Sequence, residues 1–223
     1  MKRIFTALLL LAISVAALAK DPQGPKKVSV LGDSYSAFAS IIPQGYIPYY
    51  PNEACGVTEQ SQMWWQIVCD KCGLQLEKVN AWSGSALCNT GYGNYNPTSA
   101  FIGRTDLLGN PDIILVCGGT NDSWGRSPIG DYKYRNWSDE ELGCFRPAMA
   151  KLLKDLKKKY PKAQILFVLN NDLSYDIDCT VLKLCAKYKV QVVELHDISK
   201  VNAHPDKTGM EQFAEQVIPF IKK

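Results

Sequence analysis

Short apolar runs alternate along the chain with longer stretches in which apolar residues recur every three or four positions. The short runs predict five strands, at residues 28–31, 74–80, 113–117, 165–169 and 190–195. The recurring positions predict amphipathic helices over residues 61–72, 147–160, 177–188 and 208–221. Because strands and helices alternate, the pattern predicts an α/β fold with a doubly wound sheet of about five parallel strands.

The end of the last predicted helix and the two longest loops carry further expectations. Thr208 and Glu211 have the spacing of a capping box, and Pro219 is expected to distort the final turn. Residues 86–106 and 123–142 show no useful periodicity. Loops of that length inside a compact domain are usually functional or disordered, and the aromatic content of residues 86–106 favours a function.

Small polar residues follow the predicted strands at the points where the strands end. Gly32-Asp33-Ser34 follows the first strand, Ser83-Gly84 the second and Gly119-Thr120-Asn121-Asp122 the third. In parallel sheets of this class the functional crevice lies at the carboxyl ends of the strands. We therefore expect these segments, and the one after Leu195, to meet at one active site.

The first 19 residues differ from the rest of the chain. Lys2 and Arg3 precede an apolar run over residues 4–19, which ends in Ala17-Leu18-Ala19 and predicts a cleaved signal peptide. The run is shorter than the roughly 20 residues of a spanning helix, although an uncleaved anchor is the alternative. We expect a single domain over residues 20–223, secreted or periplasmic and without stable membrane insertion. The oligomeric state stays open.

Charge and cysteine content narrow the classes of partner and cofactor. Loss of Lys2 and Arg3 lowers the formal charge from +3 to +1, which gives no support to a nucleic-acid partner. Export makes disulfides plausible, but eight cysteines allow 105 full pairings. Cys117 lies in an apolar run and is expected to be a buried thiol. Cys69 and Cys72 have redox-motif spacing, but no second Cys/His pair completes a zinc site, so we expect neither metal nor cofactor.

The nucleophile, base and oxyanion donors of a serine hydrolase can all be assigned at the sheet edge. A serine hydroxyl is a poor nucleophile unless a base takes its proton, and the chain contains only His196 and His204. His196 directly ends a strand, whereas His204 lies in a loop that could reach over the sheet edge, so His204 is the preferred base. Acyl transfer also needs donors for an oxyanion, and the Ser34 N–H, the Gly84 N–H and the Asn121 amide could supply them.

Taken together and in order, these motifs resemble those of the SGNH hydrolases, also called the GDSL-type esterase/lipase superfamily. Gly32-Asp33-Ser34 is similar to the first block of that family, Gly84 to the second, Gly119-x-Asn121-Asp122 to the third and His204-Pro205 to the last. The resemblance implies a three-layer α/β/α, flavodoxin-like fold. It also implies a serine esterase in which Ser34 is the nucleophile, His204 the base, and Ser34, Gly84 and Asn121 the oxyanion hole.

One departure from the family pattern concerns the acid that orients the histidine. The last block of the family is usually Asp-x-x-His, but Val201 stands three residues before His204. Asp197, after the last strand, could approach His204 from elsewhere. Otherwise a backbone carbonyl holds the imidazole and the site is a Ser-His dyad.

The sequence therefore favours a secreted serine esterase that hydrolyses carboxylic esters, with short acyl groups on carbohydrates as the first candidate substrates. Aromatic residues in the two long loops are candidates for the rim of its crevice: Tyr92, Tyr95, Trp124, Tyr132, Tyr134 and Trp137. Arg104 and Arg126 could contact a substrate anion, although surface ion pairs are the default expectation. The alternatives are a glycan-binding protein of the same fold without turnover and a thiol-disulfide protein that uses Cys69 and Cys72.

Overall fold

The computed structural model of the chain describes residues 24–90 and 97–222. Five strands form one parallel sheet in the order β2-β1-β3-β4-β5. Their bounds are β1 Lys27–Gly32, β2 Gln75–Ala81, β3 Ile113–Cys117, β4 Gln164–Leu169 and β5 Gln191–Glu194. This order is the flavodoxin-like one, so the predicted α/β class and the number of strands are confirmed.

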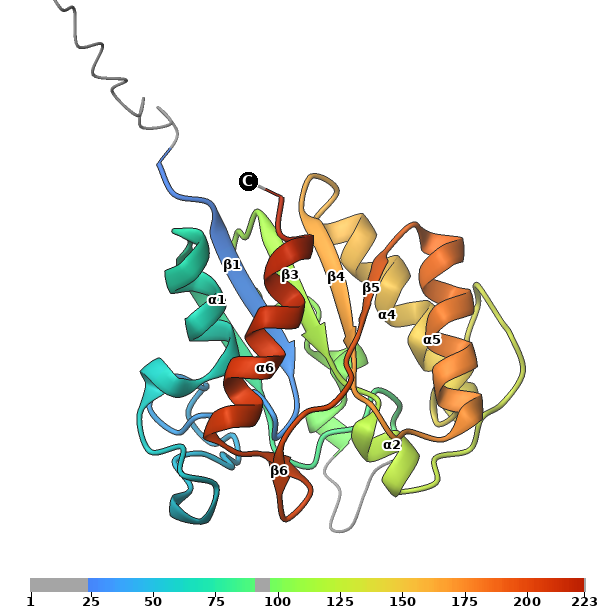
Figure 1. Cartoon of the computed structure of the whole chain (residues 1–223). Helices are drawn as coiled ribbons and strands as arrows, with labels where there is room; N and C mark the ends of the chain where they lie inside the picture. The colour runs from blue at the N-terminus through green and yellow to red at the C-terminus, as the bar shows by residue number, and fades with distance from the viewer. Residues whose placement is uncertain (1–23, 91–96, 223) are drawn as a thin grey trace, which may run out of the picture.

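Four long helices cover the two faces of the sheet. Helices α1 (Trp64–Cys72) and α6 (Lys207–Val217) pack on one face, and α4 (Phe145–Lys159) and α5 (Tyr175–Tyr188) pack on the other (Figure 1). The short helices α2 (Thr120–Trp124) and α3 (Asp139–Leu142) lie in the connections. A small hairpin of β6 (Lys200–Val201) and β7 (His204–Pro205) precedes α6.

Strand β3 shows why the sequence of a central strand is continuously apolar. Ile113 and Leu115 belong to the core under α1 and α6, whereas Ile114 and Val116 belong to the core under α4 and α5. Successive side chains of a strand point to opposite faces, and here both faces are covered. The two hydrophobic cores therefore lie on either side of one sheet.

The structure corrects the start of the last helix and confirms the distortion expected at Pro219. Asp206 caps α6, because its side chain accepts a hydrogen bond from the Gly209 N–H at 2.8 Å. The capping box predicted from Thr208 is wrong, since the short strand β7 leads the chain into the helix two residues earlier. Helix α6 ends at Val217, and a 3₁₀ turn over residues 218–220 contains Pro219, as expected from its missing N–H.

The cysteines form no disulfide bond in the structure, which describes all eight of them, so the expectation of disulfides is not supported. Cys69 and Cys117 lie in the core under α1 and α6, while Cys88 and Cys185 lie in the core on the other face. The sheet therefore separates these thiols. Cys117 is fully buried, as the sequence predicted, and burial raises the pKa of its thiol well above the usual value.

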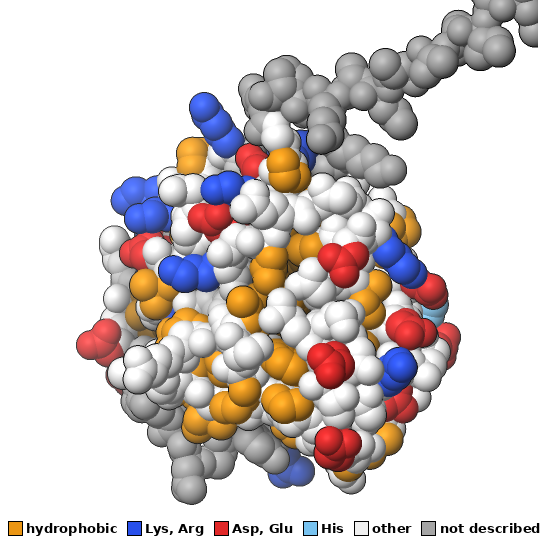
Figure 2. Space-filling model, turned by 90° about the vertical axis from the view of Figure 1, so that its left-hand side faces the viewer, with side chains coloured by type: hydrophobic (Ala, Val, Ile, Leu, Met, Phe, Trp, Pro, Cys, Tyr) orange, Lys and Arg blue, Asp and Glu red, His pale blue; other side chains and the backbone are white. Residues whose placement is uncertain are grey.

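The surface beside edge strand β2 carries hydrophobic side chains between scattered charges (Figure 2). A shallow hollow there is lined by Ile41, Ile42, Pro43, Tyr46, Lys78, Asn80 and Leu107. Within residues 24–90 and 97–222, no helix is both long and apolar enough to cross a membrane.

Strand β1 lies between β2 and β3. The chain places β2 on one side of β1 and then crosses to place β3 on the other side, so the direction of winding reverses at β1. This is the topological switch point, where ligands of such sheets bind beyond the carboxyl ends of the strands. Ser34 follows β1, Gly84 follows β2 and Asn121 follows β3. The topology therefore gathers the predicted residues at one place.

Candidate active site

Ser34 lies in a tight turn directly after β1, and its hydroxyl faces a histidine. A Cβ on Gly32 would lie 2.6 Å from the Cβ of Ser36, so only glycine allows the chain to turn this closely. Ser34 is 3% exposed, and its Oγ lies 2.9 Å from Nε2 of His204. This is hydrogen-bond distance for a nucleophile and its base.

His204 reaches Ser34 because it begins the second strand of a β-hairpin whose turn has two residues. Asn202 and Ala203 both have positive φ angles, 49° and 62°, as a type I′ turn requires. The carbonyl oxygen of Asn202 lies 3.0 Å from Nδ1 of His204. Because a carbonyl can only accept, Nδ1 carries the proton, and Nε2 is left to accept from the Ser34 hydroxyl.

The structure does not bring Asp197 to His204, which corrects the expectation that the Asp197 carboxylate could orient the imidazole. The Asp197 carboxylate lies 3.1 Å from Nδ1 of His196, on the surface, where these side chains are 95% and 73% exposed. Val201 pairs with His204 across the hairpin and packs against the core under α1 and α6. The backbone carbonyl of Asn202 therefore occupies the place of the acid.

The surroundings of His204 keep its imidazole neutral. Burial lowers the pKa of His204 below its usual value of 6.5, and the positive charge of Lys200 acts in the same direction. The hydrogen bond to Asn202 opposes both effects. An imidazole with a lowered pKa is unprotonated at neutral pH, and this is the state in which it can take a proton.

The predicted residues line one hollow of about 460 Å³ at the sheet edge. Its lining is Ser34, Tyr49, Ser83, Gly84, Asn121, Trp124, Asn202, Ala203 and His204. Gly84 has a φ of +78°, a conformation that favours glycine. The Asn121 amide donates one hydrogen to the Ser85 carbonyl at 2.9 Å, which fixes its orientation and leaves its second N–H for a ligand.

Two buried charged residues hold the loops that carry these donors. The Asp122 carboxylate accepts from the backbone N–H groups of Leu87 (2.8 Å) and Cys88 (3.3 Å), just beyond Gly84. The Arg104 guanidinium is 1% exposed and donates to the carbonyls of Gly32, Asn80 and Ser99 and to side chains of Asn80 and Ser85. The expectation that Arg104 meets solvent or substrate is therefore wrong, because its partners lie inside the protein.

A buried carboxyl group lies beside the nucleophile. Asp33 is fully buried and accepts from the Tyr35 N–H through Oδ1, while Oδ2 has no hydrogen-bond partner. Burial raises the pKa of this carboxyl to about 7, although the Tyr35 N–H and Arg104 both act to lower it. Oδ1 therefore helps to fix the turn that carries Ser34.

The tyrosines around the His204 hairpin were not assigned to the site by the sequence. The hydroxyl of Tyr35 donates to the Ala203 carbonyl and that of Tyr50 to the Pro205 carbonyl, each at 2.6 Å. Both rings are fully buried. The carbonyls on either side of His204 are therefore each tied to the core. In the sequence, Tyr50 lies in the tyrosine-rich segment 43–51 and Tyr35 directly follows Ser34.

Of the aromatic residues expected at the crevice, four are described by the structure, and three of these lie elsewhere. Tyr92 and Tyr95 are outside the described residues, and Trp124 lines the hollow. The remaining three have cations of α4 and α5 over their rings: Arg146 and Lys183 over Tyr132, Lys187 over Tyr134, and Lys154 over Trp137. These rings therefore lie in a loop that packs against α4 and α5, and not in the crevice.

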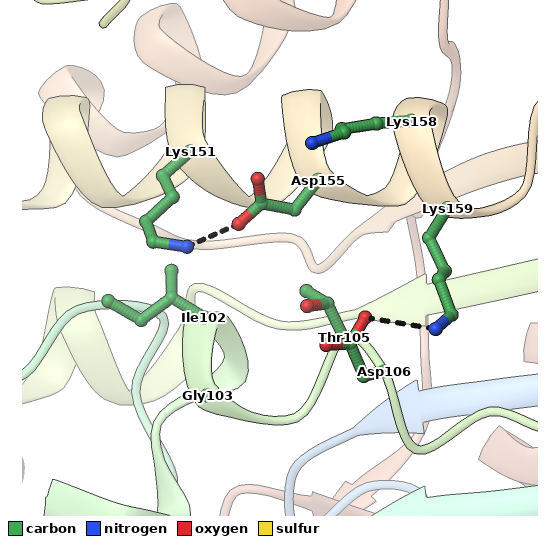
Figure 3. A pocket seen from close by; sticks show the side chains of 8 residues that line it. All are labelled: Ile102, Gly103, Thr105, Asp106, Lys151, Asp155, Lys158 and Lys159. Atoms are coloured by element: carbon green, nitrogen blue, oxygen red, sulfur yellow. Dashed lines mark hydrogen bonds and ion pairs between the residues drawn. The ribbon is translucent and has the colours of Figure 1, made fainter. Parts of the chain in front are cut away.

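A second hollow, of about 440 Å³, lies against α4 and contains none of the predicted residues (Figure 3). Lys151 pairs with Asp155, and Lys159 pairs with Asp106 at 3.8 Å, so these charges compensate one another. In the part of the chain that the structure describes, no cluster of three His, Cys, Asp or Glu side chains could hold a metal ion. The serine–histidine hollow is therefore the candidate active site.

The chain is similar to known proteins over nearly its whole length. The profile of the GDSL-like lipase/acylhydrolase family matches residues 26–221. A protein from Bacteroides ovatus, named a GDSL-like lipase, has 42% identity and a TM-score of 0.86 over 89% of this chain and 98% of its own. Its counterpart from Bacteroides uniformis has the same identity and TM-score over 89% of this chain and 96% of its own.

A more distant similarity extends to a family two carbohydrate esterase from Clostridium thermocellum, solved in complex with cellohexaose. The two share 18% identity and a TM-score of 0.61 over 89% of this chain and 64% of the esterase, which shows a common fold. No curated protein matches the chain.

Proposed function

Because the chain belongs to the GDSL-like lipase/acylhydrolase family, we propose that it is a serine esterase that cleaves carboxylic esters through Ser34 and His204. The observation that carries the proposal is the 2.9 Å contact between Ser34 Oγ and His204 Nε2. The opposite ring nitrogen is bound to the Asn202 carbonyl. The imidazole is thereby held in the tautomer that accepts the serine proton.

In the proposed reaction, Ser34 Oγ attacks the ester carbonyl while His204 takes the hydroxyl proton. The carbonyl oxygen becomes an oxyanion, which the N–H groups of Ser34, Gly84 and the Asn121 side chain stabilise; one such donor is worth about 2.7–4 kcal/mol. His204 then gives its proton to the departing alcohol, which leaves an acyl group on Ser34. Water, deprotonated by His204, attacks this acyl-enzyme and releases the acid.

The proposed site works as a dyad. When His204 takes the proton it becomes positively charged, and its Nδ1–H points at the Asn202 carbonyl oxygen at 3.0 Å. A carbonyl carries only a partial negative charge, so it orients the ring well but stabilises the imidazolium less than a carboxylate would. The Asn202 carbonyl therefore takes over the orienting part of the acid's role.

Short acyl groups on carbohydrates are the proposed substrates. The hollow is about 460 Å³, and Trp124 offers an aromatic surface beside the polar groups of Ser83 and Asn202. Rings of that kind suit sugar faces. The distant neighbour with bound cellohexaose is a carbohydrate esterase, and the predicted signal peptide would place this enzyme outside the cytoplasm, where such substrates occur.

A fluorophosphonate probe tests the nucleophile. We expect the mature protein to be labelled and to hydrolyse p-nitrophenyl acetate, and we expect Ser34→Ala to abolish both. Ser174→Ala, at an exposed serine before α5, is the matched control and should behave as the wild type. Labelling that survives in Ser34→Ala would overturn the assignment, and so would loss of labelling in the control alone.

A second candidate function is glycan binding without turnover. The observation that favours it is that Nδ1 of His204 meets the Asn202 carbonyl and not a carboxylate of the described residues, with Val201 at the usual acid position. This candidate predicts saturable binding of an acetylated oligosaccharide with no release of acetate. Acetate release that depends on Ser34 excludes it.

A further inference from the structure

The face of the His204 ring is covered by a second ring. Tyr49 and His204 lie with their ring centroids 3.6 Å apart and their planes at 8°, which is full parallel stacking. Tyr35 and Trp124 approach the same imidazole in tilted and edge-on arrangements, at 5.3 Å and 6.0 Å. Only Tyr49 therefore presents the π face of its ring to the face of the imidazole among these contacts.

We propose that Tyr49 is a positioning residue that supplies part of what the missing carboxylate would do for His204. This inference rests on the proposed esterase function. Its ring keeps the imidazole in the plane that aims Nε2 at Ser34. When the imidazole takes the serine proton, the negative π face of Tyr49 stabilises the positive charge, as aromatic faces stabilise cations within about 6 Å.

Tyr49 is held independently of any substrate. Its backbone N–H donates to the Ala37 carbonyl at 3.0 Å, and its ring packs edge-on against Tyr50 at 5.0 Å. Burial and the neighbouring Cys55 thiol raise the pKa of its hydroxyl to about 12, so that hydroxyl stays neutral. Because Tyr50 also ties the hairpin through the Pro205 carbonyl, one segment positions both the ring and the backbone of His204. The contact is therefore built into the fold.

The other groups around His204 do not supply a negative charge. Lys200, on β6, is a cation and lowers the pKa of His204. Tyr35, next to the nucleophile, has a hydroxyl whose pKa burial raises, so it stays neutral. Cys55 lies behind Tyr49, and burial raises the pKa of its thiol. Among the described residues around His204, the Asn202 carbonyl and the Tyr49 ring face are thus the groups that favour the imidazolium.

The two variants that separate the ring face from the hydroxyl are Tyr49→Phe and Tyr49→Leu. Phenylalanine keeps the stacked face, whereas leucine keeps an apolar side chain without π electrons. Tyr49→Met serves the same purpose if Tyr49→Leu does not fold. Since the chain contains only two histidines, the His204 resonances can be followed by NMR during a pH titration, with His196 as an internal reference.

We expect Tyr49→Leu to lower the pKa of His204 by roughly 0.5 to 1, the range that loss of a cation–π contact implies. Tyr49→Phe should keep the wild-type titration, and the His196 resonances should titrate alike in all variants. A pKa of His204 that is unchanged or raised in Tyr49→Leu would overturn the proposal. This measurement does not need turnover, so it stands apart from failure of the esterase assignment.

Kinetics give the second measurement. Because His204 acts as a base only when neutral, kcat/KM falls as the pH drops below its pKa. In Tyr49→Leu this acid limb should move to lower pH while the plateau of kcat falls by about tenfold, with KM little changed. Tyr49→Phe should keep the acid limb of kcat/KM and the plateau of kcat as in the wild type. A fall in activity without movement of the acid limb would contradict a role through His204.

Discussion

The two histidines of the chain lie in regions that differ in every respect that matters for catalysis. His196 has a carboxylate partner, Asp197, but both side chains are largely exposed and neither lines the active-site hollow. His204 has no carboxylate partner among the residues that the structure describes, yet it lies 2.9 Å from Ser34 and is enclosed by aromatic rings. An imidazole–carboxylate pair therefore does not mark the base in this protein.

This difference shows that the position of a histidine in the fold, and not a carboxylate beside it, makes it the candidate base. Water screens the charge of an exposed pair such as His196–Asp197, so the pair has little effect beyond its own surface. The Asn202 carbonyl lies 3.0 Å from Nδ1 of His204 and only two residues away along the chain. The hairpin itself therefore holds this carbonyl against His204, whereas the Asp197 carboxylate contacts His196 instead.

The largest expected effect comes from removing each imidazole in turn. His204→Ala should lower kcat by about 10²–10⁴-fold, because general-base assistance is lost. His196→Ala should leave kcat and KM unchanged, since His196 does not line the hollow. Steady-state hydrolysis of p-nitrophenyl acetate measures both. Equal losses of kcat in the two variants would contradict the assignment of His204, and not His196, as the base.

An intermediate effect is expected from Tyr35→Phe, which removes the hydroxyl that ties the hairpin next to His204. The Ala203 carbonyl loses its 2.6 Å partner, and a part-buried hydrogen bond of this kind is worth about 0.5–1.5 kcal/mol. We expect a Tm lower by roughly 1–6 °C, since each kcal/mol is worth about 2–4 °C in a protein of this size. We also expect a lower kcat, because the hairpin then holds Nε2 of His204 less firmly against Ser34.

Calorimetry and kinetics of Tyr35→Phe should be compared with those of Tyr175→Phe. Tyr175 is 81% exposed, so loss of its hydroxyl should change neither Tm nor kcat. If Tyr35→Phe matched this control, the tyrosine tie would have no part in holding His204, and its region would resemble that of His196 more closely than the geometry indicates.

The sequence predicted the sheet and the four residues that meet at its edge because both follow local rules. Apolar runs such as residues 113–117 have to be strands covered on both faces, and motifs after such strands have to meet at the switch point. Ser34, Gly84, Asn121 and His204 are therefore placed together by topology alone. No side-chain detail was needed for that step.

The partners of those residues were not predictable in the same way. The contact of His204 with the Asn202 carbonyl depends on two consecutive residues with positive φ, and nothing in Asn202-Ala203 demands that conformation. Arg104 looks like a surface cation, yet its partners are backbone carbonyls that only the folded chain brings together. Tyr49 meets His204 across 155 residues of sequence, and no local pattern encodes a contact of that kind.

The smallest expected effect is the most direct test of the comparison between His196 and His204. Asp197→Asn removes the only carboxylate that contacts a histidine in the described part of the chain, but that histidine is His196. We expect kcat/KM to stay within about twofold of the wild type, as for a surface substitution, and the His204 resonances to titrate unchanged. A tenfold loss would mean that Asp197 reaches His204 during turnover and that the site is a triad. An unchanged rate means that the Asn202 carbonyl and the aromatic enclosure suffice to hold the base.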